Sequence, residues 1–350
     1  MGRSLFHTHR ALGKHRAAHY PPPCRNATLA LLEKNNLPRS SHVPRWHDAD
    51  TMTALLLLIA CFSLGVLVAR YAHPPQGLAQ GINWWVIYIA LPALVLELIP
   101  RLDADWQLWF LVAAMWIVFL GAWLLAAIVG RSLGWSRARI GGVVLAGGLS
   151  NTAFTGYPLI EALHGKEGLA LAVVTDQLGC SILLATGGVF VASLYSGGGK
   201  PSWNMLLRRV LLFPAFLALI AGLVAGAFGG WPPALDNVFA RVGGTLTPLA
   251  LFSIGLQFKL HLNRSQLGAA ALALSWKLAL APLAVYLIGY ASGIGGLTLT
   301  VGVLQAAMSP MISSAILAEQ YRLEPEIAHM ALGAGIVISL VTVPLIDRLV

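Results

Sequence analysis

The sequence predicts an all-α integral membrane protein of ten transmembrane helices in two inverted five-helix repeats. Hydrophobic residues make up 57% of the 350 residues and charged residues only 11%, whereas about a quarter of the residues in an ordinary soluble domain are charged. Long apolar stretches recur without the period-two alternation of barrel strands. Corresponding features of the two halves lie about 154 residues apart. Because each half has an odd number of helices, the second must enter the membrane from the opposite side.

Each predicted helix is an apolar stretch close to the roughly 20 residues that cross a bilayer. A short polar loop separates five stretches of the first repeat from five of the second. The first repeat, 52–198, contains the predicted spans 53–71, 82–100, 107–130, 139–163 and 169–195. The second repeat, 199–350, contains 205–228, 235–257, 266–290, 296–318 and 327–349.

Residues 1–51 differ in composition from this ten-helix body. They carry eight Lys/Arg, three Asp/Glu and six of the ten histidines, without the periodicity of a packed core. They lack the apolar region of a signal peptide, and Met52 stands directly before the first span. We favour a translation start at Met52; the open alternative is a disordered basic tail that binds acidic lipid or nucleic acid. Because this leader supplies more than half of the net charge of +9, that charge does not indicate a nucleic-acid partner.

Spans four and nine are both interrupted by polar residues and a proline. Irregular backbone at membrane depth is tolerated only where protein or a water-filled cavity satisfies its polar groups, so matched breaks indicate a central binding site. The competing interpretation is that the polar residues only satisfy backbone groups around a kink. Repetition in both halves favours the site. The residues concerned are Asn151, Thr152, Thr155, Tyr157 and Pro158 in span four, and Gln305, Ser309, Pro310 and Ser313 in span nine.

A half-helix that begins in mid-membrane presents unpaired N–H groups with a partial positive charge, which favours an anion. Two such ends at one crossing would bind an anion without an arginine. We therefore expect the nine residues of the breaks to bind substrate. Asn151 and Gln305 occupy equivalent positions of the repeats, and we expect them to orient a carboxylate.

Two charged residues, Asp176 and Lys277, lie deep in predicted spans five and eight. A charge at the bilayer centre costs several kcal/mol unless it is paired or hydrated, so both are functional candidates. We expect Asp176 to bind a coupling ion, H⁺ or Na⁺, and Lys277 to compensate substrate or ion charge. The alternative is a structural ion pair between helices, such as one between these two residues. The three cysteines form neither a disulfide framework nor a zinc spacing, so no metal or cofactor is expected.

Three motifs resemble the auxin efflux carrier family in its bacterial branch. They are SNTAFTGYPL at 150–159, TPLALFSIGL at 247–256 and AAMSPMISSAILAEQYRLEPEIA at 306–328, and the resemblance covers essentially 52–350. It implies a secondary transporter of small organic anions, such as dicarboxylates or auxin-like carboxylates, that operates by alternating access. It also implies a scaffold of helices one, two, six and seven and a moving part in which helices four and nine cross.

Two other functions are open, a polytopic membrane enzyme and a non-transporting sensor descended from a carrier. The sequence contains no nucleophile elbow, HExxH motif or paired aspartates, which disfavours the enzyme. The expected partners are a small organic anion and the lipid bilayer, without nucleic acid, and a homodimer is left open. The expected location is the bacterial cytoplasmic membrane.

Lysine and arginine orient the predicted spans. The connections after odd-numbered spans hold ten of these residues, and the other connections with the C-terminus hold four. Because cytoplasmic loops are enriched in Lys and Arg, both ends of the ten-helix body should lie outside the cytoplasm. In a cysteine-free background, single cysteines at Gly198 and Val350 are expected to label from opposite sides, Gly198 from the cytoplasm. Labelling of both positions from one side would contradict the ten-span prediction.

Overall fold

The computed structural model describes residues 49–102, 105–197, 203–258 and 263–350, all within one compact unit, Pro44–Val350. The predicted leader, 1–51, lies almost wholly outside the described residues. Within them the secondary structure is helical, apart from a single antiparallel bridge between Ser150 and Pro310. The described residues therefore confirm the predicted all-α class.

Short irregular turns join many of the helices. The helices of the first half are α2 (Ala49–Leu67), α3 (Leu78–Trp85), α4 (Leu91–Leu98), α5 (Leu108–Ser132), α6 (Arg137–Gly148), α7 (Tyr157–Val174), α8 (Ser181–Leu183) and α9 (Val189–Ser196). Five π-helical turns connect or extend them, Val68–Ala72, Val86–Ala90, Thr152–Gly156, Thr175–Cys180 and Leu184–Gly188, and the 3-10 turn Ile99–Arg101 follows α4.

The second half also consists of helices, and one π-helical turn joins two of them. Proline begins α11, α12 and α18, where its missing N–H costs nothing because first-turn groups have no intrahelical acceptor. The helices are α10 (Trp203–Leu211), α11 (Pro214–Ala227), α12 (Pro233–Gly243), α13 (Leu246–Gln257), α14 (Leu267–Ser275), α15 (Ala281–Ala291), α16 (Gly296–Ala306), α17 (Ile312–Gln320) and α18 (Pro325–Asp347). The π-helical turn Trp276–Leu280 joins α14 to α15.

Seven helical segments of the described residues are long and apolar enough to cross a membrane, and α11 and α16 are apolar but shorter. One segment has 45 residues and is interrupted at Gly165, whose φ of 60° and ψ of −156° are not helical. The ten-span count and the inverted repeat stay predictions. The seven segments are Thr51–Ala72, Leu78–Arg101, Leu108–Ser132, Thr152–Ser196, Pro233–Gln257, Leu267–Ala291 and Pro325–Asp347.

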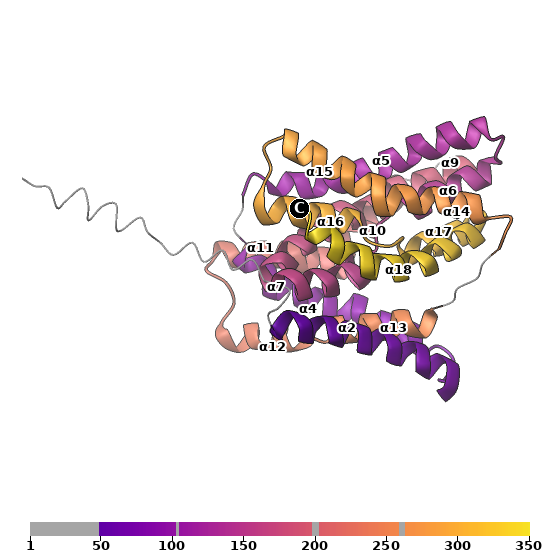
Figure 1. Ribbon diagram of the computed structural model, residues 1–350. Helices are drawn as coiled ribbons and strands as arrows, with labels where there is room; N and C mark the ends of the chain where they lie inside the picture. Colours follow the sequence, from indigo (N-terminus) through magenta and orange to yellow (C-terminus); the bar gives the residue numbers. More distant parts are fainter. Residues whose placement is uncertain (1–48, 103–104, 198–202, 259–262) are drawn as a thin grey trace, which may run out of the picture. The chain divides into compact units, whose positions relative to one another are not determined.

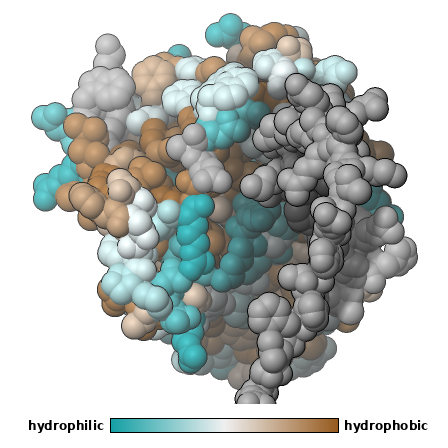
Figure 2. Space-filling view, turned by 90° about the vertical axis from the view of Figure 1, so that its left-hand side faces the viewer, coloured by the Kyte–Doolittle hydropathy of each residue, from teal (hydrophilic) through white to brown (hydrophobic). Residues whose placement is uncertain are grey.

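Large apolar side chains cover the outer faces of these helices. Leu64, Leu124, Ile128, Leu287 and Val341 are each more than half exposed. Soluble monomers rarely expose contiguous apolar patches above about 600 Å². Figure 2 shows hydrophobic and hydrophilic residues side by side on the face turned to the viewer. Together with the apolar helices, the exposed leucines and valines indicate an integral membrane protein surrounded by acyl chains.

The helices pack as two groups. In the α13 group, α2 packs along α13, which also contacts α3, and α4 packs against α11 and α12. In the α6 group, α6 contacts α5, α9, α14, α17 and α18, while α16 contacts α5, α7 and α15. Figure 1 shows α2 and α13 side by side at the lower edge and α5 and α15 at the upper edge. Helix α7 belongs to the α6 group and also contacts α2 and α4 across the boundary.

Two facing glycines set the close approach of α2 and α13. A Cβ atom added to Gly65 would lie 2.3 Å from the carbonyl oxygen of Phe252, and one added to Gly255 would lie 2.3 Å from that of Phe62. Backbone oxygens cannot turn aside as a flexible side chain can. Small residues allow such close approach in membranes, where packing rather than the hydrophobic effect drives helix association.

The two breaks predicted from the sequence lie against each other, backbone to backbone. The N–H of Asn151 donates to the carbonyl of Ser309 at 2.9 Å, and the N–H of Met311 donates to the carbonyl of Leu149 at 3.1 Å. On one side of this crossing α6 contacts α17, and on the other α7 contacts α16. Pro310 sits in the bridge, where it has no N–H to leave unpaired.

The contact between α2 and α13 predicts a selective loss of stability. Gly65→Ala is expected to lower the midpoint of thermal unfolding in detergent, because overpacking costs about 1–3 kcal/mol. Gly81→Ala is the matched control, since this glycine of α3 has open space around the position of a Cβ. Its midpoint should stay unchanged or rise, because alanine favours the helix. Equal shifts for the two variants would contradict the close contact.

Candidate functional site

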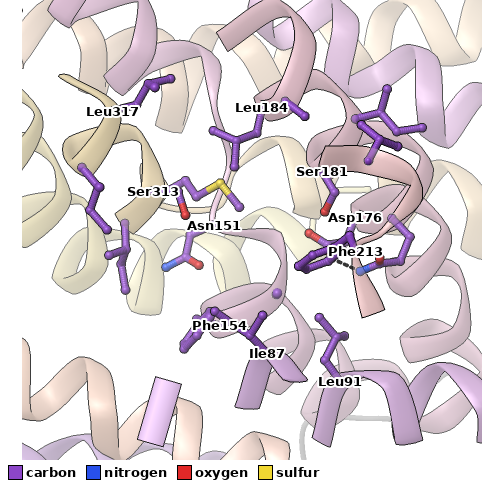
Figure 3. Close-up of a pocket in the computed structure, with 18 of the residues that line it drawn as sticks. Ile87, Leu91, Asn151, Phe154, Asp176, Ser181, Leu184, Phe213, Ser313 and Leu317 are labelled. Atoms are coloured by element: carbon purple, nitrogen blue, oxygen red, sulfur yellow. Dashed lines mark hydrogen bonds between the residues drawn. The ribbon is translucent and has the colours of Figure 1, made fainter. Parts of the chain in front are cut away.

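A cavity of about 380 Å³ lies beside the crossing and is lined by both helix groups. This volume falls in the usual range of small-molecule sites, roughly 300–1,000 Å³. Figure 3 shows Asn151, Ser313, Asp176 and Ser181 around the cavity, with Phe154, Phe213 and Leu91 among the apolar walls. The polar lining residues are Asn151, Asp176, Gln177, Ser181, Ser313 and Gln320, all from the α6 group.

Helix α17 begins at the wall of the cavity. Met311 precedes it in an extended conformation, with φ of −76° and ψ of 140°, and no side chain caps the first turn. Ile312 and Ser313 line the cavity. First-turn N–H groups have no intrahelical acceptor and carry the positive end of the helix dipole. The start of α17, with the Ser313 hydroxyl, can therefore donate hydrogen bonds to an anion.

Asn151 lies next to Ser313 at this wall (Figure 3). Its backbone is held in place, because its carbonyl accepts from the Thr155 hydroxyl at 2.8 Å and from the Gly156 N–H at 3.1 Å. The side chain is 1% exposed, and its Nδ2 has no hydrogen-bond partner among the described residues. A buried donor without a partner is unfavourable, so an acceptor that reached this amide through a small movement of the cavity wall would satisfy it.

Asp176 lies in the π-helical turn Thr175–Cys180 and is 1% exposed. Its Oδ1 accepts from the Thr152 hydroxyl, and its Oδ2 accepts from the Tyr157 hydroxyl at 2.9 Å and from Gln177 Nε2 at 2.7 Å. Three neutral donors thus surround the carboxylate. Single π-helical turns often occur at functional sites. Asp176 lies on the cavity wall, and its role in ion binding stays a prediction.

Lys277 lies behind the crossing and does not line the cavity. It is wholly buried, and its Nζ donates to the Ser150 hydroxyl. The Ser150 carbonyl accepts from Cys180 Sγ at 3.1 Å. No ion pair joins Lys277 to Asp176 in the described part of the chain. Lys277 therefore places its amine against the bridge itself.

Two of the nine residues predicted to bind substrate, Asn151 and Ser313, line the cavity. Gln305 lies behind it, with Nε2 donating to the carbonyls of Thr152 at 3.4 Å and Ala172 at 3.5 Å. Its Oε1 and the Ser309 hydroxyl have no partner among the described residues. The other seven of the nine predicted residues are buried and do not line the cavity: Thr152, Thr155, Tyr157, Pro158, Gln305, Ser309 and Pro310.

Sequence reasoning missed two kinds of lining residue. Ile87, Leu91, Phe213 and Phe216 cover the cavity from the α13 group, and nothing in an apolar sequence distinguishes such residues from those facing lipid. Gln177 directly follows Asp176 and also lines the cavity. Its polar side chain next to a charge at membrane depth is a signal that could have found it.

Known proteins resemble this chain over most of its length. A family model described as "Membrane transport protein" matches residues 50–198 and 201–346. An "Uncharacterized transporter" of Methanothermobacter thermautotrophicus is 24% identical over 300 residues, 85% of this chain and 97% of that protein. A "Putative malonate transporter" of Rhizobium meliloti is 26% identical over 311 residues, 84% of this chain and 94% of that protein.

A plant protein shares a shorter region. The "Probable auxin efflux carrier component 5a" of Oryza sativa subsp. japonica is 29% identical over 153 residues, 41% of this chain and 42% of that protein. The names of these relatives are those of transporters and not of enzymes. Since the family model covers nearly all of the described residues, the chain belongs to the membrane transport protein family, the family of the auxin efflux carriers that its motifs resemble.

Proposed function

We propose that the protein is a secondary transporter of small organic anions, with the carboxylate bound where α17 begins. One observation carries this proposal: the bridge between the two breaks places the start of α17, the Ser313 hydroxyl and the unpartnered Asn151 amide at one wall of a cavity. A helix start and neutral donors bind an anion without the cost of burying a cation. The name of the Rhizobium relative, a malonate transporter, makes dicarboxylates one class to test.

The proposed topology has ten spans in two inverted repeats, 52–198 and 199–350, in the bacterial cytoplasmic membrane with both ends outside. The matched breaks support it, since α6 and α7 are separated in the same manner as α16 and α17. The bend at Gly165 also supports it, because the 45-residue segment Thr152–Ser196 is interrupted there, and the part that follows Gly165 is by itself longer than the ~20 residues of one span.

We propose alternating access as the mechanism, and the way the two groups meet at the cavity supports it. The α6 group supplies the polar lining, and the α13 group supplies Ile87, Leu91, Phe213 and Phe216. An apolar surface can slide over the cavity without breaking hydrogen bonds. In this mechanism the α13 group is the scaffold, and the α6 group carries the site from one side of the membrane to the other.

The two sides of the crossing differ: the cavity lies on the side of α17, whereas polar contacts hold α7 against the α13 group on the other side. The cavity extends along α17 from Met311 to the exposed Gln320. On the side of α7, polar contacts tie that helix to the α13 group. Lys166 donates to Glu97 at 2.5 Å, and the Thr247 hydroxyl donates to Glu161 at 2.8 Å. We therefore propose that this conformation admits substrate from the α17 side.

The remaining candidate residues have supporting roles in this proposal. Asp176, the acidic residue on the cavity wall, would bind the cation that accompanies the anion, H⁺ or Na⁺. Lys277, against Ser150, would offset the negative charge that enters the site. The role of Gln305 in substrate binding stays a prediction, as do those of Thr152, Thr155, Tyr157, Pro158, Ser309 and Pro310.

Asn151→Ala is the test of this site. We expect the affinity for a bound carboxylate to fall roughly 5- to 150-fold, which corresponds to the ~1 to 3 kcal/mol lost when a buried polar partner is left unpaired. The measurement is isothermal titration of the detergent-purified protein with a panel of mono- and dicarboxylates, followed by uptake into proteoliposomes.

Gln305→Ala is the matched control, since it removes an equally buried amide from the equivalent repeat position. The sequence predicts an affinity loss for both variants, and the position of Asn151 on the cavity wall predicts that its loss is larger. Gln305→Ala should mainly lower the thermal stability of the unliganded protein. If Asn151→Ala binds carboxylates with wild-type affinity and its stability is unchanged, the carboxylate does not bind at the crossing.

A further inference from the structure

Asp176 carries the one charge among the described side chains that line the cavity, and neutral groups alone hold it. Its Oδ1 accepts from the Thr152 hydroxyl, and its Oδ2 accepts from the Tyr157 hydroxyl at 2.9 Å and from Gln177 Nε2 at 2.7 Å. No lysine, arginine or histidine forms an ion pair with it in the described part of the chain. The negative charge at this wall is therefore stabilised by hydrogen bonds and not by a cation.

The Thr152 hydroxyl has a second acceptor within reach, because it lies 3.5 Å from the carbonyl oxygen of Ser150. A hydroxyl both donates and accepts, and its hydrogen can turn from one acceptor to another. If Asp176 takes up a proton on Oδ1, the acid can donate this proton to the Thr152 oxygen while the Thr152 hydrogen turns to Ser150. Oδ2 keeps both of its donors. The same network therefore satisfies the carboxylate and the neutral acid.

A sodium ion fits this network less well. Hard cations are held by several oxygen ligands, whereas one of the three groups around the carboxylate is the N–H of Gln177, which has no lone pair to offer. Asp176 and its three partners are each no more than 1% exposed. A metal cation would have to displace the Gln177 amide, whereas a proton needs only the rotation of one hydroxyl group.

Few other titratable or charged groups lie on the elements that pack against the Asp176 turn. Cys180 of the same turn donates to the Ser150 carbonyl at 3.1 Å, and Lys277 donates to the Ser150 hydroxyl. Helices α8 and α11 and the turn Thr152–Gly156 carry none. The others are Tyr157, Glu161, His164, Lys166 and Glu167 on α7 and Arg131 on α5. Of these, only the Tyr157 hydroxyl bonds to the carboxylate.

An organic anion in the cavity and an ionised Asp176 disfavour each other. Like charges repel strongly across a low-dielectric space, and a nearby negative charge favours the protonated form of a carboxylate. Protonation of Asp176 removes the repulsion and leaves the donors at the start of α17, with the Ser313 hydroxyl, unaltered. The anion and the proton therefore favour each other's binding without direct contact.

We infer that the protein carries its organic anion together with a proton, which Asp176 holds while Thr152, Tyr157 and Gln177 act as positioning residues. This inference rests on the proposed function and names its coupling ion. One proton is taken up with each anion on one side of the membrane and released with it on the other. Transport of a monocarboxylate is then electrically neutral, and Na⁺ takes no part.

The test is isothermal titration of the full chain, purified in detergent, with malonate and with 4-methylpentanoate. Both ligands stay ionised between pH 7 and pH 9, so a pH dependence in this range belongs to the protein. By linkage, the affinity should fall at least tenfold from pH 7 to pH 9, with roughly one proton bound per ligand at the upper end. Titrations in two buffers of different ionisation enthalpy count these protons. Replacing Na⁺ by K⁺ should leave the affinity unchanged.

Three variants locate the proton. Asp176→Asn resembles the neutral acid, so binding should lose its pH dependence, and a pH gradient should no longer accelerate uptake into proteoliposomes. Thr152→Val removes a donor that favours the carboxylate, so the pH dependence should move to higher pH. Thr186→Val is the matched control, because this hydroxyl donates to the Ile182 carbonyl at 2.7 Å and does not line the cavity. Its pH profile should equal that of the unaltered protein.

The outcomes separate this inference from the proposed function. If a carboxylate binds with the same affinity from pH 7 to pH 9 without proton uptake, or only when Na⁺ is present, the inference is wrong and the organic-anion carrier stands. A pH dependence that survives in Asp176→Asn also overturns it. If no simple carboxylate binds or enters proteoliposomes, the proposed function fails together with the inference. The titrations of the unaltered protein decide the matter even if Asp176→Asn does not fold.

Discussion

The backbone contact between the two broken helices is the constraint on which the site depends. Unpaired peptide groups are too costly to leave in a membrane interior, and here each break supplies acceptors for the other, through Asn151 to Ser309 and Met311 to Leu149. Neither break is satisfied alone. This pairing places α6 beside α17 and α7 beside α16. It also brings Asn151 and Ser313, from opposite halves of the chain, to one cavity wall without any side-chain bond between them.

The breaks themselves could be predicted, because a proline together with polar residues seldom interrupts an apolar run at membrane depth unless the helix is broken there. Polar or charged residues within apolar stretches are easily recognised in the sequence, and this identifies Asn151, Ser313 and Asp176. The direction in which Gln305 points could not be predicted, since a buried helix is apolar on every face and has no periodicity that marks the cavity side. Lys277 shows a similar limit. Its depth identifies it as unusual, but only the folded chain reveals that its partner is the Ser150 hydroxyl.

The polar lining of the cavity comes from the α6 group, whereas both helix groups supply apolar lining residues, and the sequence identifies only the polar ones. Polar residues are rare enough in this chain to be noticed one by one. Phe213 and Phe216, in contrast, are two of 12 phenylalanines and could equally face lipid. A wall of this kind depends on the packing of α4 against α11, which no local pattern encodes. The shape of substrate that the cavity would admit therefore depends on residues that the sequence does not identify.

The contact between Glu97 and Lys166 has a consequence for water. The Glu97 side chain is only 2% exposed, whereas that of Lys166 is 61% exposed. If α7 moves away from α4, the ammonium group departs into solvent while the carboxylate stays among apolar side chains. An ionised carboxylate cannot be left there dry, so water has to follow the retreating lysine. Separation on this side would then require water to enter between the helices.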